Sequence, residues 1–138
     1  MIIGLAGKKG SGKDMIGNYL IENYNFKRYA FADPVKEICR HLFGFNDNEL
    51  YGNAKEKMTS LNITPRESFQ KIGTEFGRDL IYDLFPNLNI NKGELWIYLF
   101  KKFMDKNKKK QNYVITDVRF NNEAKAIKEK NGIIIYIN

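Results

Sequence analysis

The stretch that decides the fold is Ile2-Ile3-Gly4-Leu5-Ala6-Gly7-Lys8-Lys9-Gly10-Ser11-Gly12-Lys13-Asp14. It opens with a short, continuous apolar run at 2–6, which is typical of a strand buried on both faces of a parallel sheet. A glycine-rich turn follows, and apolar side chains then recur at helical spacing from 14 to 24. The stretch therefore predicts a strand, a tight glycine turn and a helix, in this order.

The turn has the spacing of a phosphate-binding loop. Gly7, Gly12 and Lys13 match the pattern G-x-x-x-x-G-K, which is informative only between a strand and a helix. Glycines let consecutive backbone N–H groups point inward at a phosphate, and the next helix adds the positive end of its dipole. Lys13 then places an ammonium against β- and γ-phosphates. The alternative is a tight glycine turn with no ligand. The predicted phosphate-binding residues are Gly7, Lys8, Lys9, Gly10, Ser11, Gly12, Lys13 and Asp14.

Asp14 departs from the usual form of this loop. Ser or Thr normally stands here and presents a hydroxyl to Mg²⁺. A carboxylate at this position either holds the metal through water or caps the N-terminus of the helix.

The rest of the chain alternates between strand and helix patterns. Strands are predicted at 2–6, 26–31, 113–116 and 133–137, and helices at 14–24, 34–43, 65–80, 92–103 and 121–130. Asp33 before Pro34 predicts an N-cap, Gly44 predicts the end of that helix, and Thr64 predicts a second N-cap. Short apolar strands separated by helices favour a three-layer α/β/α domain with a parallel sheet over residues 1–138. A helical insertion is predicted at roughly 44–108.

Composition limits the classes of function. The net charge is +7, and the densest lysine run, 101–110, is interpreted as a solvated helix end and loop rather than a nucleic-acid contact. The apolar opening is too short for a signal peptide or a membrane span, and one cysteine allows no internal disulfide. We expect a cytoplasmic protein that binds no membrane. Cys39 and His41 are expected to be packing residues.

A second candidate site follows the predicted strand at 113–116. Asp117 and Arg119 stand just beyond its end, and ligands of parallel sheets bind at that edge. Asp117 has three open roles: binding Mg²⁺, positioning an acceptor phosphate or holding a sugar. Arg119 is suited to clamp a phosphate with two hydrogen bonds. The alternative is that Asp117 caps the next helix and Arg119 pairs with Glu123.

A third candidate site lies in the predicted middle helix. Gly73 and Gly77 weaken a helix, and indicate a break or the close approach of backbone or ligand. Arg66 and Arg78 are about three turns apart, so one helix face can carry both. Gln70, one turn after Arg66, could recognise a base. Ordinary surface charge is the alternative.

Several of these motifs resemble, in their order and spacing, the deoxynucleoside monophosphate kinases of phages and large viruses. They are the loop 7–14 with its GKD ending, Phe31-Ala32-Asp33-Pro34-Val35-Lys36, Thr64-Pro65-Arg66, Gly73-Thr74-Glu75-Phe76-Gly77-Arg78, Trp96, and Asp117-Val118-Arg119-Phe120-Asn121-Asn122-Glu123-Ala124. The resemblance spans essentially the whole chain. A GKD loop is usual in this group, which accounts for Asp14.

The resemblance implies the adenylate-kinase-like P-loop fold and Mg²⁺-dependent transfer of the γ-phosphate of ATP to a deoxynucleoside monophosphate. It implies a catalytic set of Lys13, Arg78, Asp117 and Arg119, and a metal set of Asp14 and Asp117. The acceptor set it implies is Asp33, Lys36, Arg66, Phe69, Gln70, Arg78, Trp96 and Arg119. The helical insertion would then bind the acceptor. A viral protein of this kind would act in the host cytoplasm.

The chain departs from the family's pattern at Asn138, directly after the last predicted strand. Relatives usually continue with an arginine-bearing lid, a helix and another strand. We therefore expect weak adenine selectivity and low turnover, and a sheet edge that favours a homodimer. The alternative functions are another small-metabolite kinase of this fold, of the phosphomevalonate or dephospho-coenzyme A type, and a non-catalytic nucleotide- or nucleic-acid-binding module.

Overall fold

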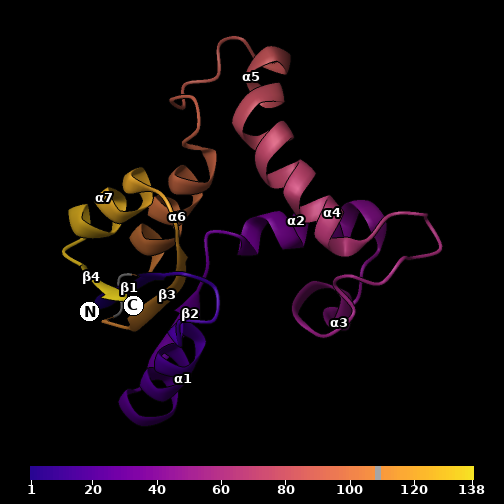
Figure 1. Ribbon diagram of the computed structural model, residues 1–138. Coiled ribbons are helices and arrows are strands. Elements are labelled where there is room, and N and C mark those ends of the chain that lie inside the picture. The colour runs from indigo at the N-terminus through magenta and orange to yellow at the C-terminus, as the bar shows by residue number, and fades with distance from the viewer. Residues whose placement is uncertain (108–109) are drawn as a thin grey trace. The chain divides into compact units, whose positions relative to one another are not determined.

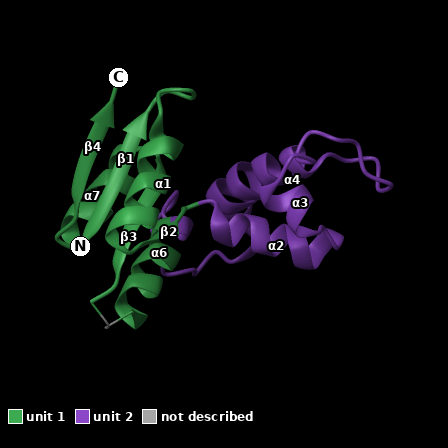
Figure 2. Cartoon of the chain, turned by 90° about the horizontal axis from the view of Figure 1, so that it is seen from below, with its two compact units in different colours: residues 1–31, 97–138 green, residues 32–96 purple. Residues whose placement is uncertain are grey.

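The computed structural model describes residues 1–107 and 110–138 (Figure 1). Positions 108 and 109 of the lysine-rich run, and with them the predicted end of the insertion, lie outside the described residues. The described chain forms two compact units (Figure 2). Unit 1 comprises Met1–Phe31 and Ile97–Asn138, and unit 2 comprises Ala32–Trp96. Each unit is described by itself.

Unit 1 is built on a four-stranded sheet in the order β2-β3-β1-β4. The strands are β1 (Ile2–Gly7), β2 (Phe26–Tyr29), β3 (Asn112–Val118) and β4 (Ile133–Ile137). Every pairing is parallel. The four strands and their parallel arrangement confirm the predicted α/β class.

Helices lie on both faces of this sheet. They are α1 (Lys13–Tyr24), α6 (Leu95–Lys106), whose first two residues belong to unit 2, and α7 (Asn121–Glu129). Leu5 and Val114 pack with Ile16 and Leu20 of α1 in one cluster. Ile115, the next residue of β3, packs in a separate cluster with side chains of α6 and α7. Because successive side chains of a strand point to opposite faces, the two clusters lie on opposite faces of the sheet. The sheet and the helices on its two faces therefore form three layers.

Unit 2 is helical. Its elements are α2 (Asp33–Phe43), α3 (Asp47–Tyr51), α4 (Pro65–Gln70), a π-helix η1 (Lys71–Leu80) and α5 (Ile81–Leu84). Cys39, Phe45 and Leu50 form its buried core. Two predicted helix boundaries are confirmed: Gly44 ends α2 at φ +71°, and the Thr64 hydroxyl accepts a hydrogen bond from the Glu67 N–H at 3.1 Å.

Two predictions about α2 are wrong. The N-cap is Ala32 and not Asp33, because the backbone of Asp33 is already helical and Asp33 is the first residue of α2. Its negative charge still favours the positive end of the helix. His41 is exposed in the last turn rather than packed, although Cys39 is fully buried as expected, which raises the pKa of its thiol to about 11.

The helix predicted at 65–80 is interrupted by η1, as its two glycines indicated, and Trp96 supplies the physical reason. The Trp96 indole Nε1 donates to the Gly73 carbonyl oxygen at 2.8 Å, so this oxygen has a partner outside the helix. A side chain at Gly77 would have its Cβ 2.3 Å from the Trp96 ring, so only glycine fits beneath the indole. The indole of Trp96 can therefore contact the helix closely at these two glycines. π-Helical turns of this kind are frequent at functional sites.

The two glycines of η1 predict opposite effects on stability. We expect Gly77→Ala to lower the free energy of unfolding by about 1–3 kcal/mol, since the ring beneath it must move. Gly73→Ala is the matched control, because its Cβ would lie 3.5 Å from Val35 in ordinary contact and alanine favours a helix. Chemical denaturation followed by circular dichroism measures both. Equal stability of the two variants would show that the indole does not depend on Gly77.

None of the helices described at 1–107 and 110–138 has the length and apolar content needed to span a bilayer.

Candidate active site

The ends of β1 and β3 place two of the predicted sites at one edge of the sheet. Ala6 of β1 is the register partner of Val118 of β3, and the strands run parallel. The turn at 8–12 leaves β1 one residue later, while Asp117 and Arg119 flank Val118. The carboxyl ends of these neighbouring strands therefore bring the phosphate loop beside the Asp117–Arg119 segment.

The backbone of the loop adopts conformations that favour glycine. Gly10 and Gly12 have φ of +81° and +98°, and a Cβ at either would meet open space. At Gly7, φ is +157° and a Cβ would lie 2.5 Å from the carbonyl oxygen of Ile137. The Ser11 N–H donates to the Lys8 carbonyl oxygen at 3.0 Å and closes the turn. The glycines thus shape a curled backbone with free space at its bend.

The loop fits a phosphate group. Within the described part of the chain, the Ser11 hydroxyl oxygen is buried and has no hydrogen-bond partner. The first hydrogen bond of α1 is from the Ile16 N–H to the Gly12 carbonyl oxygen, so the N–H groups of the first turn have no acceptor within the helix. An anion at this position satisfies donors that the fold leaves open and lies at the positive helix end.

Cations and one carboxylate surround this loop. Lys13 is half-buried, and its ammonium makes no hydrogen bond or ion pair with any described residue; Lys8 and Lys9 are exposed. Asp14 is exposed in the first turn of α1. Gly12 is the N-cap and α1 has no side-chain cap, so Asp14 does not serve as one. The other predicted role of Asp14, binding a metal through water, stays a prediction.

Asp117 is half-buried and connects two strand ends. Its Oδ1 accepts a hydrogen bond from the Phe31 N–H at 2.9 Å, just beyond β2. This bond fixes the carboxylate at the sheet edge. Asp117 does not cap α7, whose N-cap is Phe120.

Arg119 is held by its backbone rather than its side chain. The Glu123 Oε1 accepts hydrogen bonds from the N–H groups of Arg119 at 2.8 Å and Phe120 at 3.0 Å. The predicted alternative, an Arg119–Glu123 ion pair, is not found. The guanidinium of Arg119 is exposed and makes no hydrogen bond or ion pair within residues 1–107 and 110–138. Glu123 therefore fixes the start of α7 and leaves this guanidinium open to a ligand.

Loss of Glu123 should destabilise the protein. We expect Glu123→Ala to lower the free energy of unfolding by about 1–3 kcal/mol. Glu123 is only 5% exposed, so its loss leaves two backbone N–H groups without an acceptor where little water reaches them. Glu123→Gln keeps an acceptor oxygen without the charge and should lose less. Urea unfolding compares the three proteins. Identical midpoints would show that water replaces the carboxylate at no cost.

The candidate acceptor residues of unit 2 have different surroundings. Arg66 pairs with Glu56 at 3.0 Å, whereas an Arg78 guanidinium nitrogen would lie 3.8 Å from a Cβ at Gly93. The two arginines thus lie beside different loops. Gln70 is exposed, and Asp33 begins α2. Trp96 is 6% exposed and bonded to Gly73, so its surroundings are those of a packing residue.

Lys36 and Phe69 lie together. The Lys36 ammonium is 5.7 Å from the centre of the Phe69 ring and 4.9 Å from that of Tyr51. Sequence reasoning missed Tyr51 and the network behind it. Its hydroxyl donates to Glu37, which also accepts from Arg40, and Arg40 donates to Asp47. The sequence signal that could have located this network is the capping pattern of Asn46 and Glu49. It predicts the start of α3, but not the contacts of Tyr51 with α2.

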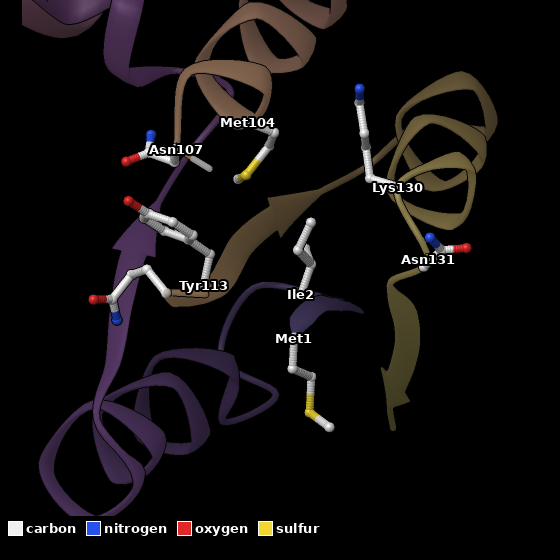
Figure 3. A pocket seen from close by; sticks show the side chains of 8 residues that line it. Met1, Ile2, Met104, Asn107, Tyr113, Lys130 and Asn131 are labelled. Atoms are coloured by element: carbon white, nitrogen blue, oxygen red, sulfur yellow. The ribbon is translucent and has the colours of Figure 1, made fainter. Parts of the chain in front are cut away.

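A cavity of about 260 Å³ lies away from this edge. It is lined at the beginnings of strands, with Met1 and Ile2 between Tyr113 and Lys130 (Figure 3). Because the strands are parallel, this is the opposite edge from the phosphate loop. No cluster of three or more metal-ligating side chains occurs among the described residues.

Comparison with known proteins decides the family. A family model described as deoxynucleotide monophosphate kinase matches residues 1–81. A putative deoxynucleotide monophosphate kinase of Acanthamoeba polyphaga mimivirus is 39% identical over 146 residues, which cover 100% of this chain and 74% of the relative. The chain belongs to the deoxynucleotide monophosphate kinase family.

Two phage proteins extend the comparison. The deoxynucleoside-5'-monophosphate kinase of Escherichia phage T5 is 24% identical over 195 residues, covering 96% of this chain and 74% of the relative. The deoxynucleotide monophosphate kinase of Enterobacteria phage T4 is 29% identical over 76 residues, covering 48% of this chain and 32% of the relative. The resemblance stated from the motifs is therefore confirmed. The kinase-family model spans the phosphate loop and most of unit 2, and the mimivirus alignment also includes Asp117 and Arg119.

Proposed function

We propose that this chain transfers the γ-phosphoryl group of ATP to a deoxynucleoside monophosphate and releases the diphosphate. One observation carries the proposal. In a member of this kinase family, the glycine loop that follows β1 has hydrogen-bond donors without acceptors, and it lies beside residues 117–119 at the end of β3. Such a reaction requires alignment of two phosphates and neutralisation of their charge, and no side-chain nucleophile.

The loop residues hold the donor nucleotide. Backbone N–H groups from Gly7 to Asp14 and the hydroxyl of Ser11 donate to phosphate oxygens. Lys13 places its ammonium where negative charge gathers on the transferring group, and Lys8 and Lys9 add cations at the rim. Because these donors are already oriented by the glycines, little reorganisation opposes binding.

Asp14 and Asp117 would hold Mg²⁺, which supplies charge neutralisation between phosphate oxygens. Mg²⁺ usually keeps several waters and takes one or two carboxylates with substrate phosphates. Two carboxylates therefore suffice, and a cluster of three is not required. The exposed Asp14 fits a contact through water, and the hydrogen bond from Phe31 orients Asp117.

Each unit, taken by itself, supplies candidates for binding the acceptor. Arg119 presents a guanidinium that has no partner among the described residues, suited to two hydrogen bonds to one phosphate. The candidates in the helical unit are Asp33, Lys36, Arg66, Phe69, Gln70 and Arg78. Phe69 and Gln70 are assigned to the base. Trp96 is assigned to holding η1, and so Arg78, in place. The named relatives are viral, and we place the reaction in the cytoplasm of the infected cell.

A panel of acceptors tests this function. The chain is incubated with ATP, Mg²⁺ and each deoxynucleoside monophosphate, with phosphomevalonate and dephospho-coenzyme A as acceptors of competing kinases. Diphosphate formed from one or more deoxynucleotides, and lost in Lys13→Ala, is the expected result. Formation of product only from a non-nucleotide acceptor, or from none, would overturn the proposal.

A further inference from the structure

Tyr51, the last residue of α3, lies against a lysine that the acceptor proposal uses. The ammonium of Lys36, from α2, is 4.9 Å from the centre of the Tyr51 ring and 5.7 Å from that of Phe69, from α4. Both distances are within the range of a cation–π attraction. Three helices of unit 2 thus meet at one charged group.

The hydroxyl end of the Tyr51 ring is fixed by a hydrogen-bond network of Glu37, Arg40 and Asp47. Its hydroxyl donates to Glu37 Oε2 at 2.7 Å, and Arg40 Nε donates to Glu37 Oε1 at 2.9 Å. Arg40 also reaches Asp47 Oδ1 at 2.6 Å, which ties α2 to α3. Burial, with the bond to Glu37, raises the pKa of Tyr51 and keeps its hydroxyl protonated. The hydrogen bond from Arg40, followed by that from Tyr51, lowers the pKa of Glu37.

The Phe69 ring is anchored separately. It packs against the buried core of unit 2 with Cys39 and Leu50. The two ring faces attract the Lys36 ammonium through their electron density and fix the position of that ammonium on both rings. A flexible lysine side chain loses rotamer freedom when it binds a ligand, which lowers affinity. Restricting Lys36 before the ligand arrives lowers that cost.

We propose that Tyr51 is a positioning residue that, with Phe69, holds the ammonium of Lys36 to contact the phosphate of the acceptor nucleotide. The inference rests on the proposed function, in which Lys36 belongs to the acceptor site. It adds to that function the aromatic support that places this cation.

Removal of the ring should weaken acceptor binding alone. For Tyr51→Leu we expect the KM for the deoxynucleoside monophosphate and its calorimetric Kd to rise about 3- to 30-fold, the range of a cation–π contact. The KM for ATP and kcat should stay within about twofold, since the loop belongs to the other unit. Tyr51→Phe keeps the ring and should recover most of the affinity. Tyr98→Leu is the matched control, because it removes the ring beneath Lys102 at 5.5 Å, outside the acceptor site.

A double-mutant cycle and a spectroscopic measurement separate positioning from a general structural role. In a Lys36→Ala background, Tyr51→Leu should add no further loss of affinity. The ε-methylene protons of Lys36 should show an upfield ring-current shift by NMR, lost in Tyr51→Leu and kept in Tyr51→Phe. If Tyr51→Leu fails to fold, Tyr51→Met, which removes the ring beneath Lys36, and Tyr51→Trp, which keeps a ring, test the same contact.

Each outcome decides between the two proposals. Unchanged acceptor affinity in Tyr51→Leu, losses that add to those of Lys36→Ala, or an equal loss in Tyr51→Phe would overturn the positioning role alone. Acceptor binding by the wild-type chain without transfer would overturn the proposed function alone. No binding of any deoxynucleoside monophosphate would overturn both.

Discussion

Replacing Lys13 with alanine is expected to lower kcat/KM for phosphoryl transfer about 10²- to 10³-fold, the usual cost of removing one oriented donor from a transition state. Lys13 follows Gly12 at the beginning of α1, and under the proposed function its ammonium lies where negative charge gathers on the transferring phosphate. Steady-state assay of the diphosphate product measures the loss. Most of it should appear in kcat, because that charge is greatest in the transition state.

Two controls make the Lys13 result specific. The side chain of Lys13 makes no hydrogen bond or ion pair within the described residues, so Lys13→Ala should unfold at the wild-type temperature. Lys128→Ala removes an equally charged, exposed side chain from α7 of the same unit and should leave transfer unchanged. If Lys13→Ala retained wild-type kcat/KM, the loop would not be the donor site.

Arg119→Ala is the second large effect. We expect kcat/KM for the deoxynucleoside monophosphate to fall about 100-fold, since two charge-assisted hydrogen bonds to one phosphate are lost together. Arg119→Lys restores the charge but not the planar fork, and should recover only part of the activity. Initial rates over a range of acceptor concentrations at saturating ATP measure both variants.

The backbone of Arg119 is held independently of its side chain, so the Arg119 variants change only the guanidinium. Glu123 fixes the backbone N–H of Arg119 at 2.8 Å, so truncating the guanidinium should leave the start of α7 in place. Lys125→Ala, an exposed cation one turn further on, is the control for a general loss of positive charge. A loss in Arg119→Ala that Lys125→Ala reproduces would assign the effect to net charge and not to a phosphate clamp.

Much of unit 1 could be predicted because its signals are local. The apolar run before Gly7 fixes a buried strand, and the glycine spacing up to Lys13 fixes the loop, since both depend on neighbours in the chain. Asp117 and Arg119 followed from their place at a strand end, and the edge is shared in any parallel sheet. The ranking of roles for Arg119 could not be decided, because the carboxylate of Glu123 had two possible partners, a guanidinium or two backbone N–H groups.

Unit 2 was harder to predict because its helices depend on distant contacts. A helix was expected at 65–80, with a break or a close approach at Gly73 and Gly77. Trp96 bonds to Gly73 and covers Gly77, but nothing near these glycines in the sequence shows which group approaches them. Asp33 was expected as a cap, and the helix begins one residue earlier. Tyr51 was not predicted as a site residue, because its proposed role depends on contacts with Lys36 and Glu37, which belong to another helix.

By itself, the sequence determined the class of fold, the strand, glycine turn and helix at 2–24, and the kinase family, because spacing along the chain is enough to specify these elements. Tertiary structure alone decided which groups have open bonding capacity. The side chains of Lys13, Arg119 and Ser11 have no hydrogen-bond or ion-pair partner among the described residues. The carboxylate of Glu123 accepts from backbone N–H groups, and two aromatic rings lie against the ammonium of Lys36. The physical reason is that a side chain's hydrogen bonds and ion pairs depend on neighbours far away in the chain, which no local pattern records.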